Sequence, residues 1–179
     1  LTWLRENRPG DLEYLLRDPH GRADPTRANT WASTLLVFGQ RYTNGWAKDA
    51  ALEQATADRP WTDGVSRYAR GEDYHDVLRK GIRRITGALR RELHLRGVLA
   101  SESDMKAVDA TDAGPYLERD YAWLAGFGFY GKNTMLIHPR LGSGFFLGVA
   151  LLELDVTGIA DAPRPLVGPS AQKMPVGEG

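Results

Sequence analysis

The chain has no cysteine at any of its 179 positions. Thiolate-bound zinc, cysteine-ligated iron–sulfur clusters and disulfide bridges are therefore excluded for this sequence. Proteins of reducing compartments do not depend on disulfides, so the lack of cysteine is consistent with the cytoplasmic location that we expect.

Long hydrophobic runs and an excess of one charge are also missing. No apolar run approaches the roughly 20 residues that a membrane helix needs, and no secretory leader stands at the start, so we expect no membrane contact. Basic and acidic residues balance at 23 each, which gives a net charge of +0. The overall charge does not indicate a nucleic-acid partner, although a local basic patch is compatible with one.

The composition is that of a globular domain, with 42% hydrophobic and 26% charged residues. One domain is the simplest organisation at this length. We place it at 1–156 and assign 157–179, which is rich in proline and glycine, to a linker or tail. Because the first residue is Leu1, we expect the natural start of the protein to lie further upstream.

Apolar spacing predicts a mixture of helices and strands. The clearest helix covers 74–96, where an apolar face with steps of three and four opposes an arginine-rich face, and Gly97 follows as a stop. Helices and strands do not alternate regularly, which favours an α+β layered domain over a doubly wound fold. Shorter helices are expected at 12–16 and 115–125, strands at 33–38, 108–111, 134–138 and 145–154, and a loop with some helix at 43–63.

The glycines of Gly126-Phe-Gly-Phe-Tyr-Gly131 match the pattern of dinucleotide-binding loops. With Lys132 they also match most of a P-loop, but Asn133 stands where a serine or threonine hydroxyl should meet Mg²⁺. Both motifs need a strand before the glycines and a helix after them. The expected order is reversed here, so we interpret the glycines as a helix stop and a tight turn into the next strand.

Asp112 is a lone carboxylate just before an expected helix, and by default it would cap that helix. It could equally be an acid that faces a pocket, where burial would keep it protonated near neutral pH. The residue types leave both alternatives open.

His75 and the basic helix face leave similar alternatives. His75, at the start of the long helix, is either a cofactor contact or, as the sequence alone favours, a capping or partly buried histidine. The arginine-rich face either contacts phosphates or is simply solvated, which is the commoner case. The other histidines show no metal-ligand spacing, so we expect no metal held by the protein.

Three ordered segments resemble the catalytic domain of epoxyqueuosine reductases. They are Arg67-Tyr-Ala-Arg-Gly-Glu-Asp-Tyr-His75, Thr111-Asp-Ala-Gly-Pro-Tyr-Leu-Glu-Arg119 and Ala125-Gly-Phe-Gly-Phe-Tyr-Gly-Lys-Asn-Thr134, followed by Gly142-Ser143 and Phe145-Phe-Leu-Gly148. The resemblance implies a nitroreductase-like, corrinoid-binding fold with a central, mostly antiparallel sheet flanked by helices. It also implies a monomer that converts epoxyqueuosine to queuosine in tRNA with base-off cobalamin.

The same resemblance implies roles for particular residues. Asp112 falls on the family's proton-donor aspartate, where a neutral acid would protonate the alkoxide left by epoxide opening. His75, Asp112 and Arg119 fall on positions that contact the corrinoid. The same cleft would be lined by Lys132, Asn133, Leu136, His138 and Leu147.

The chain departs from the family in its lack of cysteine, since the family continues into a domain whose cysteines hold two iron–sulfur clusters. We therefore expect a fragment, or a variant that binds corrinoid and needs an external electron donor. Two other functions stay open. One is a flavin-dependent nitroreductase-like oxidoreductase, suggested by the shared fold type. The other is a non-catalytic corrinoid- or tRNA-binding module, suggested by the missing cysteines and the basic helix.

Overall fold

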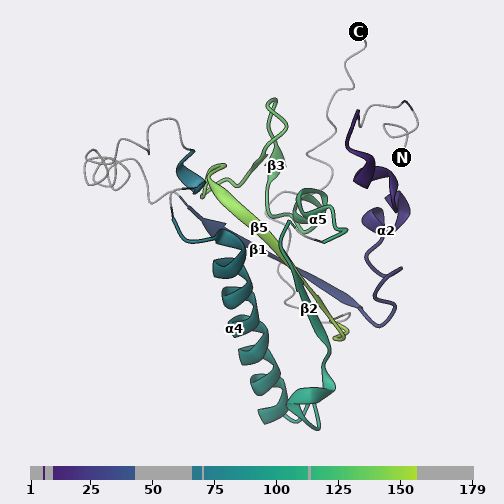
Figure 1. Ribbon diagram of the computed structural model, residues 1–179. Helices are drawn as coiled ribbons and strands as arrows, with labels where there is room; N and C mark the ends of the chain where they lie inside the picture. The colour runs from purple at the N-terminus through teal and green to yellow at the C-terminus, as the bar shows by residue number, and fades with distance from the viewer. Residues whose placement is uncertain (1–5, 7–9, 43–65, 70, 113, 157–179) are drawn as a thin grey trace, which may run out of the picture.

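A computed structural model of the chain describes residues 6, 10–42, 66–69, 71–112 and 114–156. Its centre is an antiparallel sheet of three strands in the order β1-β5-β2 (Figure 1). The middle strand β5 (Phe145–Leu152) pairs with β1 (Thr34–Arg41) on one side and β2 (Ala107–Ala110) on the other. The expected α+β class with an antiparallel sheet is confirmed.

Side chains that alternate along β5 divide the core into two layers, because successive residues of a strand point to opposite faces. Ala150 and Leu152 pack with Ile82 of the long helix α4 (Tyr74–Leu95). Val149 and Leu151 pack on the other face with Tyr116 and with Tyr121 of α5 (Glu118–Leu124). Both faces of β5 are covered, which explains why this strand reads as a nearly continuous apolar run.

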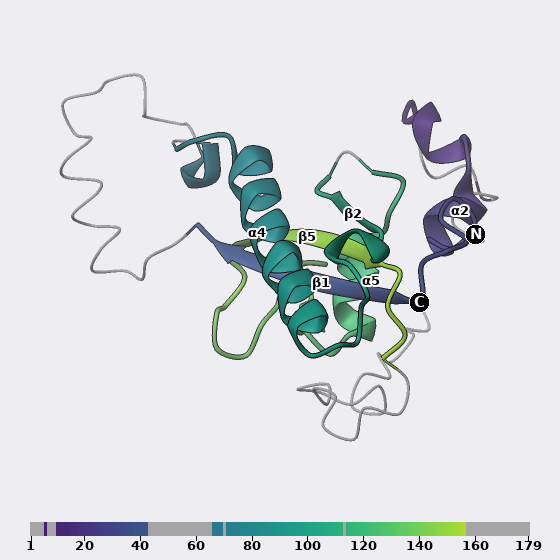
Figure 2. The same ribbon diagram turned by 90° about the horizontal axis from the view of Figure 1, so that it is seen from below.

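The long helix begins and ends as the sequence predicts (Figure 2). Asp73 caps it by accepting a hydrogen bond from the backbone N–H of His75 at 2.9 Å. At the other end Gly97 has a φ of 71°, and Val98 N–H donates to the Leu93 carbonyl in a Schellman motif. The predicted helix and its glycine stop are therefore confirmed, while the residue that caps the helix is Asp73 and not His75, for which a capping role was one expectation.

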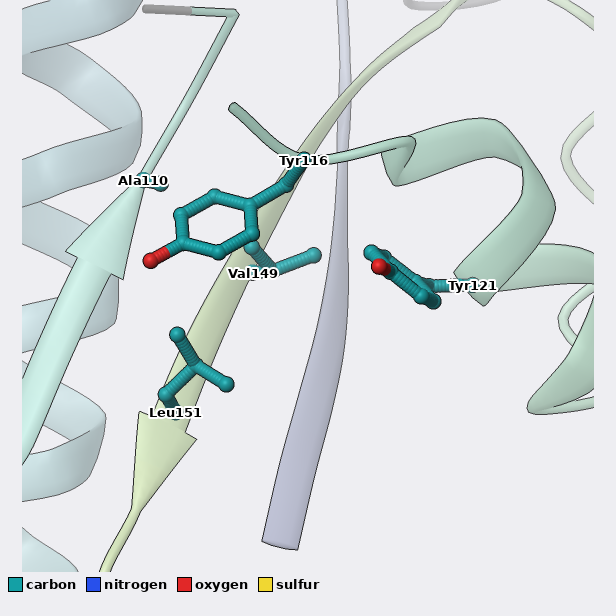
Figure 3. Packing of buried hydrophobic residues seen from close by; sticks show 5 residues of the cluster. All are labelled: Ala110, Tyr116, Tyr121, Val149 and Leu151. Carbon is teal, nitrogen blue, oxygen red and sulfur yellow. The ribbon is translucent and has the colours of Figure 1, made fainter. Parts of the chain in front are cut away.

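The core layer on the α5 side is a cluster of buried side chains from β2, β5, α5 and the chain just before α5 (Figure 3). Figure 3 shows the ring of Tyr116 over Val149, between Ala110 and Tyr121. The hydroxyl of Tyr121 donates to the carbonyl of Arg22 at 2.8 Å, and Asn29 donates to the hydroxyl of Tyr116 at the same distance. These bonds attach the N-terminal segment to α5 and to the chain that leads into it.

The glycine-rich segment has the reversed order that the sequence predicts, with α5 before it and the short strand β3 (Phe129–Tyr130) after it. Gly126 has a φ of 72° and ends α5 in a second Schellman motif. A Cβ on Gly128 would lie 2.5 Å from the carbonyl oxygen of Ile137 in β4 (Leu136–Ile137), the strand paired with β3. Gly126 is thus required for a positive φ and Gly128 for a close approach between two backbone segments of the chain.

Several expected boundaries are wrong. The helix expected from 115 begins only at Glu118, because the chain before it turns to bury Tyr116. The strand expected at 134–138 shortens to the two residues of β4, since Thr134 has a φ of 64°. A short helix α2 (Pro19–Ala23), capped by Asp18, was not expected. It follows the 3-10 turn η1 (Glu13–Leu16), and two further 3-10 turns among the described residues are η3 (Arg67–Ala69) and η4 (Glu102–Asp104).

Two expectations, the loop at 43–63 and the tail at 157–179, lie outside the described residues. Within the part of the chain that the structure describes, no helix has both the length and the apolar character needed to cross a bilayer.

Candidate functional site

A cleft of about 410 Å³ opens where the first turn of α5, the β3–β4 hairpin and the start of β5 meet. Its volume falls in the range of small-molecule sites. Apolar and charged side chains share the lining. The apolar group includes Leu117, Met135, Leu136, Phe145, Phe146 and Leu147, and the charged group consists of Arg22, Asp112, Glu118, Arg119 and Asp120.

Asp112 lies at this cleft, two residues beyond the end of β2, in a left-handed backbone conformation with a φ of 52°. The hydroxyl of Tyr74 donates a hydrogen bond to its Oδ2. Its backbone N–H donates to Oε1 of Glu118 at 3.0 Å. It does not cap α5, whose N-cap position is Leu117 without a side-chain cap, so the capping alternative is wrong. The burial considered for its side chain is also not found, because Asp112 is exposed.

Tyr74 reaches Asp112 from the first turn of α4, and its ring is fixed by stacking on two neighbouring rings. The ring stacks on Phe146 at a centroid distance of 4.1 Å and an angle of 8°, and on His75 at 4.0 Å and 27°. Burial raises the pKa of the Tyr74 phenol well above its usual range, and the hydrogen bond to Asp112 raises it further. Tyr74 is therefore a protonated hydrogen-bond donor to Asp112 at any physiological pH.

Glu118 is the half-buried carboxyl of the cleft. Burial is the main cause that raises its pKa, and the neighbouring charge of Asp112 adds to the effect. The environment that the sequence suggested for Asp112, a buried acid with a raised pKa, thus surrounds Glu118.

Two hydrogen bonds tie α5 to the β3–β4 hairpin along the cleft. Arg119 donates from Nη1 to the carbonyl of Thr134 at 3.0 Å. The hydroxyl of Tyr130 donates to Oδ1 of Asp120 at 2.6 Å. Burial is the main cause that raises the pKa of Tyr130 above its usual range, and the hydrogen bond to Asp120 adds to the effect. The walls of the cleft are therefore cross-linked by side chains from both elements.

The structure brings together some of the sequence-predicted site residues and leaves others outside the cleft lining. Asp112, Arg119, Leu136 and Leu147 line the cleft. His75 is outside the lining, stacked on Tyr74 with its Nδ1 2.8 Å from Oδ1 of Asp73.

The remaining three predicted residues lie in and after the hairpin, outside the cleft lining. Lys132 and Asn133 belong to the β3–β4 turn, where Oδ1 of Asn133 accepts the N–H of Met135 at 3.2 Å. His138 is buried, and its Nδ1 accepts the N–H groups of Arg140 and Leu141, both at 3.1 Å. Burial lowers the pKa of His138, so this ring is a neutral cap for the following turn.

Sequence reasoning missed Tyr74 and Glu118 as site residues. Both stand inside the segments that carry the family resemblance, at 67–75 and 111–119. The available signal was position within a motif, but nothing local indicates that these two side chains converge on Asp112.

Comparisons with known proteins agree with this picture. The family model described as epoxyqueuosine reductase QueG, DUF1730, matches residues 22–101. An epoxyqueuosine reductase from Francisella cf. novicida (strain Fx1) is 30% identical over 165 residues, covering 90% of this chain and 42% of the relative. One from Pseudomonas aeruginosa is 32% identical over 156 residues, covering 86% and 39%.

The fold is also similar to a solved structure, that of epoxyqueuosine reductase from Streptococcus thermophilus. The TM-score is 0.61 at 17% identity, over 94% of this chain and 42% of the other. The chain spans about two fifths of the length of the curated relatives it matches. Over 86–90% of its length the chain is thus similar to epoxyqueuosine reductases, whose family model matches residues 22–101, and its fold is similar to that of one such enzyme.

Proposed function

We propose that the chain is the corrinoid-binding catalytic part of an epoxyqueuosine reductase, with Asp112 as the proton donor. The observation that carries the proposal is the arrangement of Asp112. Its carboxyl lies at a ligand-sized cleft, bonded to the Tyr74 hydroxyl, while its backbone is bonded to Glu118. The relatives' name, epoxyqueuosine reductase, supplies the substrate class.

The residues of the cleft are compatible with cobalamin. A corrin carries its own equatorial nitrogen ligands, so a base-off cofactor requires no metal-ligand set from the protein. Among the described residues no group of three or more histidine, cysteine, aspartate or glutamate side chains could hold a metal ion. Leu136, Leu147 and Phe145 offer apolar contact for a macrocycle, and Arg119 offers a cation for anionic substituents.

The reaction removes one oxygen atom from an epoxide and requires two electrons and two protons, with water as the other product. When bound, the corrinoid would supply the nucleophile and the electrons. The chain supplies the proton: Asp112 donates to the oxygen as the carbon–oxygen bond breaks. The hydroxyl of Tyr74 is bonded to Oδ2 of Asp112, so Oδ1 is the oxygen to which we assign the proton transfer.

A metal-free preparation incubated with cob(II)alamin tests the binding step. A visible spectrum of bound base-off corrinoid is expected, whereas a protein that binds no corrinoid would contradict the proposal. A yellow protein that binds FMN instead would favour the nitroreductase-like alternative.

An Asp112→Asn variant tests the proton donor. It should keep corrinoid binding and lose epoxide reduction by about 10²–10⁴-fold when electrons come from a chemical reductant, which is the usual contribution of a general acid. Asp76→Asn, an exposed aspartate in the first turn of α4, is the matched control and should keep full activity. Activity that survives in Asp112→Asn would show that another group is the acid.

tRNA is the proposed carrier of the substrate, and the solvent face of α4 is the surface we assign to its backbone. Lys80, Arg84 and Arg91 are exposed on this face and have no ion-pair partner among the described residues. They span about 16 Å along a helix whose first residue, Tyr74, is bonded to the proposed acid. Phosphates along a strand that enters the cleft would therefore meet consecutive cations.

Replacing Lys80, Arg84 and Arg91 together with glutamine should weaken binding of an epoxyqueuosine-containing stem loop. The slope of log K against log salt should fall by roughly 2–3, because each phosphate contact contributes about 0.7–0.9. Arg96→Gln, whose guanidinium already pairs with Glu92, is the control. An unchanged salt slope would exclude this face of α4 as the tRNA-binding surface.

The monomeric state, the external electron donor and the cytoplasmic location stay predictions.

A further inference from the structure

The backbone of Asp112 is in a conformation that needs support. Asp112 and Thr134 are the non-glycine residues with positive φ in the described part of the chain. The left-handed region is disfavoured for residues with a Cβ, because the Cβ approaches the carbonyl oxygen, although aspartate tolerates it better than most. Local sequence therefore does not suffice to keep Asp112 there, and contacts from elsewhere must do so.

Asp112 is held by two elements from the two sides of the sheet. Tyr74, the first residue of α4, bonds to its carboxyl. Glu118, the first residue of α5, bonds to its backbone N–H at 3.0 Å. The helices that carry these two side chains pack in different core layers. The carboxyl and the amide of one residue are thus held independently.

Glu118 has a well-defined position because α5 is firmly packed. Tyr121, one turn further along α5, is buried and bonded to Arg22. Asp120 and Arg119 bond to the β3–β4 hairpin. The side chain of Glu118 points back along the chain by six residues to reach Asp112. An anchor on this helix can restrict Asp112 to one backbone conformation.

We infer that Glu118 is a positioning residue, which by accepting the amide proton of Asp112 holds the Asp112 carboxyl toward the cleft. The role requires an acceptor oxygen at this distance and not an acid. Glutamine keeps that oxygen and should substitute for Glu118, whereas alanine removes it. The contact itself is independent of the cofactor, but its use in catalysis rests on the proposed function of Asp112.

Amide hydrogen exchange of Asp112 in the cofactor-free chain tests the anchor directly. Glu118→Ala should speed this exchange by about tenfold, as expected for loss of one backbone hydrogen bond, and Glu118→Gln should leave it slow. Glu92→Ala, which removes an exposed carboxyl of α4, is the control and should not change it. Exchange that is equally slow in Glu118→Ala would overturn the inference.

Activity with added cobalamin and a chemical reductant tests the positioning role. Glu118→Ala should lower kcat on the order of 10²-fold with KM for the stem loop little changed, since misplacement of a reacting group acts on the chemical step. Glu118→Gln should restore kcat. A Glu118→Gln variant with slow Asp112 exchange and no activity would refute the inference, because acidity would then be required. That variant also decides the matter if Glu118→Ala does not fold.

The outcomes separate this inference from the proposed function. If Asp112→Asn stays active, the proton-donor proposal fails, while the exchange experiment still decides whether Glu118 anchors Asp112. If Glu118→Ala leaves both exchange and kcat unchanged while Asp112→Asn is inactive, the proposed function stands and Glu118 has no positioning role.

Discussion

Replacing Gly128 with alanine should destabilise the chain, because the middle glycine of the glycine-rich segment lies against the backbone of β4. The added Cβ would stand 2.5 Å from the Ile137 carbonyl oxygen and 3.0 Å from the Ile137 carbonyl carbon. Real Cβ atoms essentially never come closer than 3.0 Å to a heavy atom outside their own residue and its chain neighbours. Backbone atoms cannot rotate away as a side chain would, so β4 must retreat.

The consequence is larger than for an ordinary surface contact. The β3–β4 ladder consists of two residue pairs, Phe129 with Ile137 and Tyr130 with Leu136, closed by the bond from the Gly131 N–H to the Met135 carbonyl. Moving β4 strains both pairs and displaces Leu136, which lines the cleft. Overpacking of this kind costs about 1–3 kcal/mol, which for a chain of this size corresponds to a fall in Tm of about 2–12 °C.

Urea unfolding followed by tryptophan fluorescence and by circular dichroism measures this cost, with the slope m compared to confirm a two-state change. Gly81→Ala is the matched control, since a Cβ at Gly81 in α4 meets no atom within 4 Å. That variant should gain about 0.5–1 kcal/mol from helix propensity. A Gly128→Ala protein within about 0.5 kcal/mol of the parent would refute the close-approach explanation of this glycine.

Three further predictions concern stability and titration. The raised pKa of Glu118 means that the folded chain holds more protons than the unfolded chain above the usual glutamate pKa, so stability falls as pH rises through that interval. The free energy of unfolding of Glu118→Gln minus that of the parent should therefore be larger at pH 7 than at pH 4. Urea unfolding at both pH values measures this difference, and an equal difference at the two would contradict the prediction. Burial raises the pKa of Tyr121 to about 12, so the absorbance titration missing from Tyr121→Phe should have its midpoint there. Ile82→Ala should cost about 2–5 kcal/mol in thermal unfolding because Ile82 is 1% exposed, whereas Ile85→Ala, at 47% exposure, should stay under about 1 kcal/mol.

The glycine-rich segment shows how far sequence reasoning reached. The reversal of helix and strand around Gly126 was sufficient to reject both nucleotide-binding motifs, and the structure confirms that order. The reason for Gly128 was out of reach, because the strand that approaches it, β4, follows only after a turn. A close approach between two backbones is a tertiary fact and leaves no local pattern.

The boundaries near the site failed for a related reason. Pro115 carries a good local signal for a helix start, yet α5 begins at Glu118. Burial of the Tyr116 ring against Val149 and Ala110 outweighs the propensity of three residues. The same shift places Glu118 at the start of α5, from where its side chain reaches Asp112.

The sequence by itself determined the long amphipathic helix with its glycine stop, the long apolar strand β5, and the segments that carry the family resemblance. These follow from periodicity and capping, which act over a few residues. Only the tertiary structure decided the surroundings of Asp112. Its partner Tyr74 lies 38 positions away, and the half-buried acid with the raised pKa is Glu118. Burial and hydrogen bonding between distant segments depend on how helices pack on the sheet, and no local pattern of residues encodes that packing.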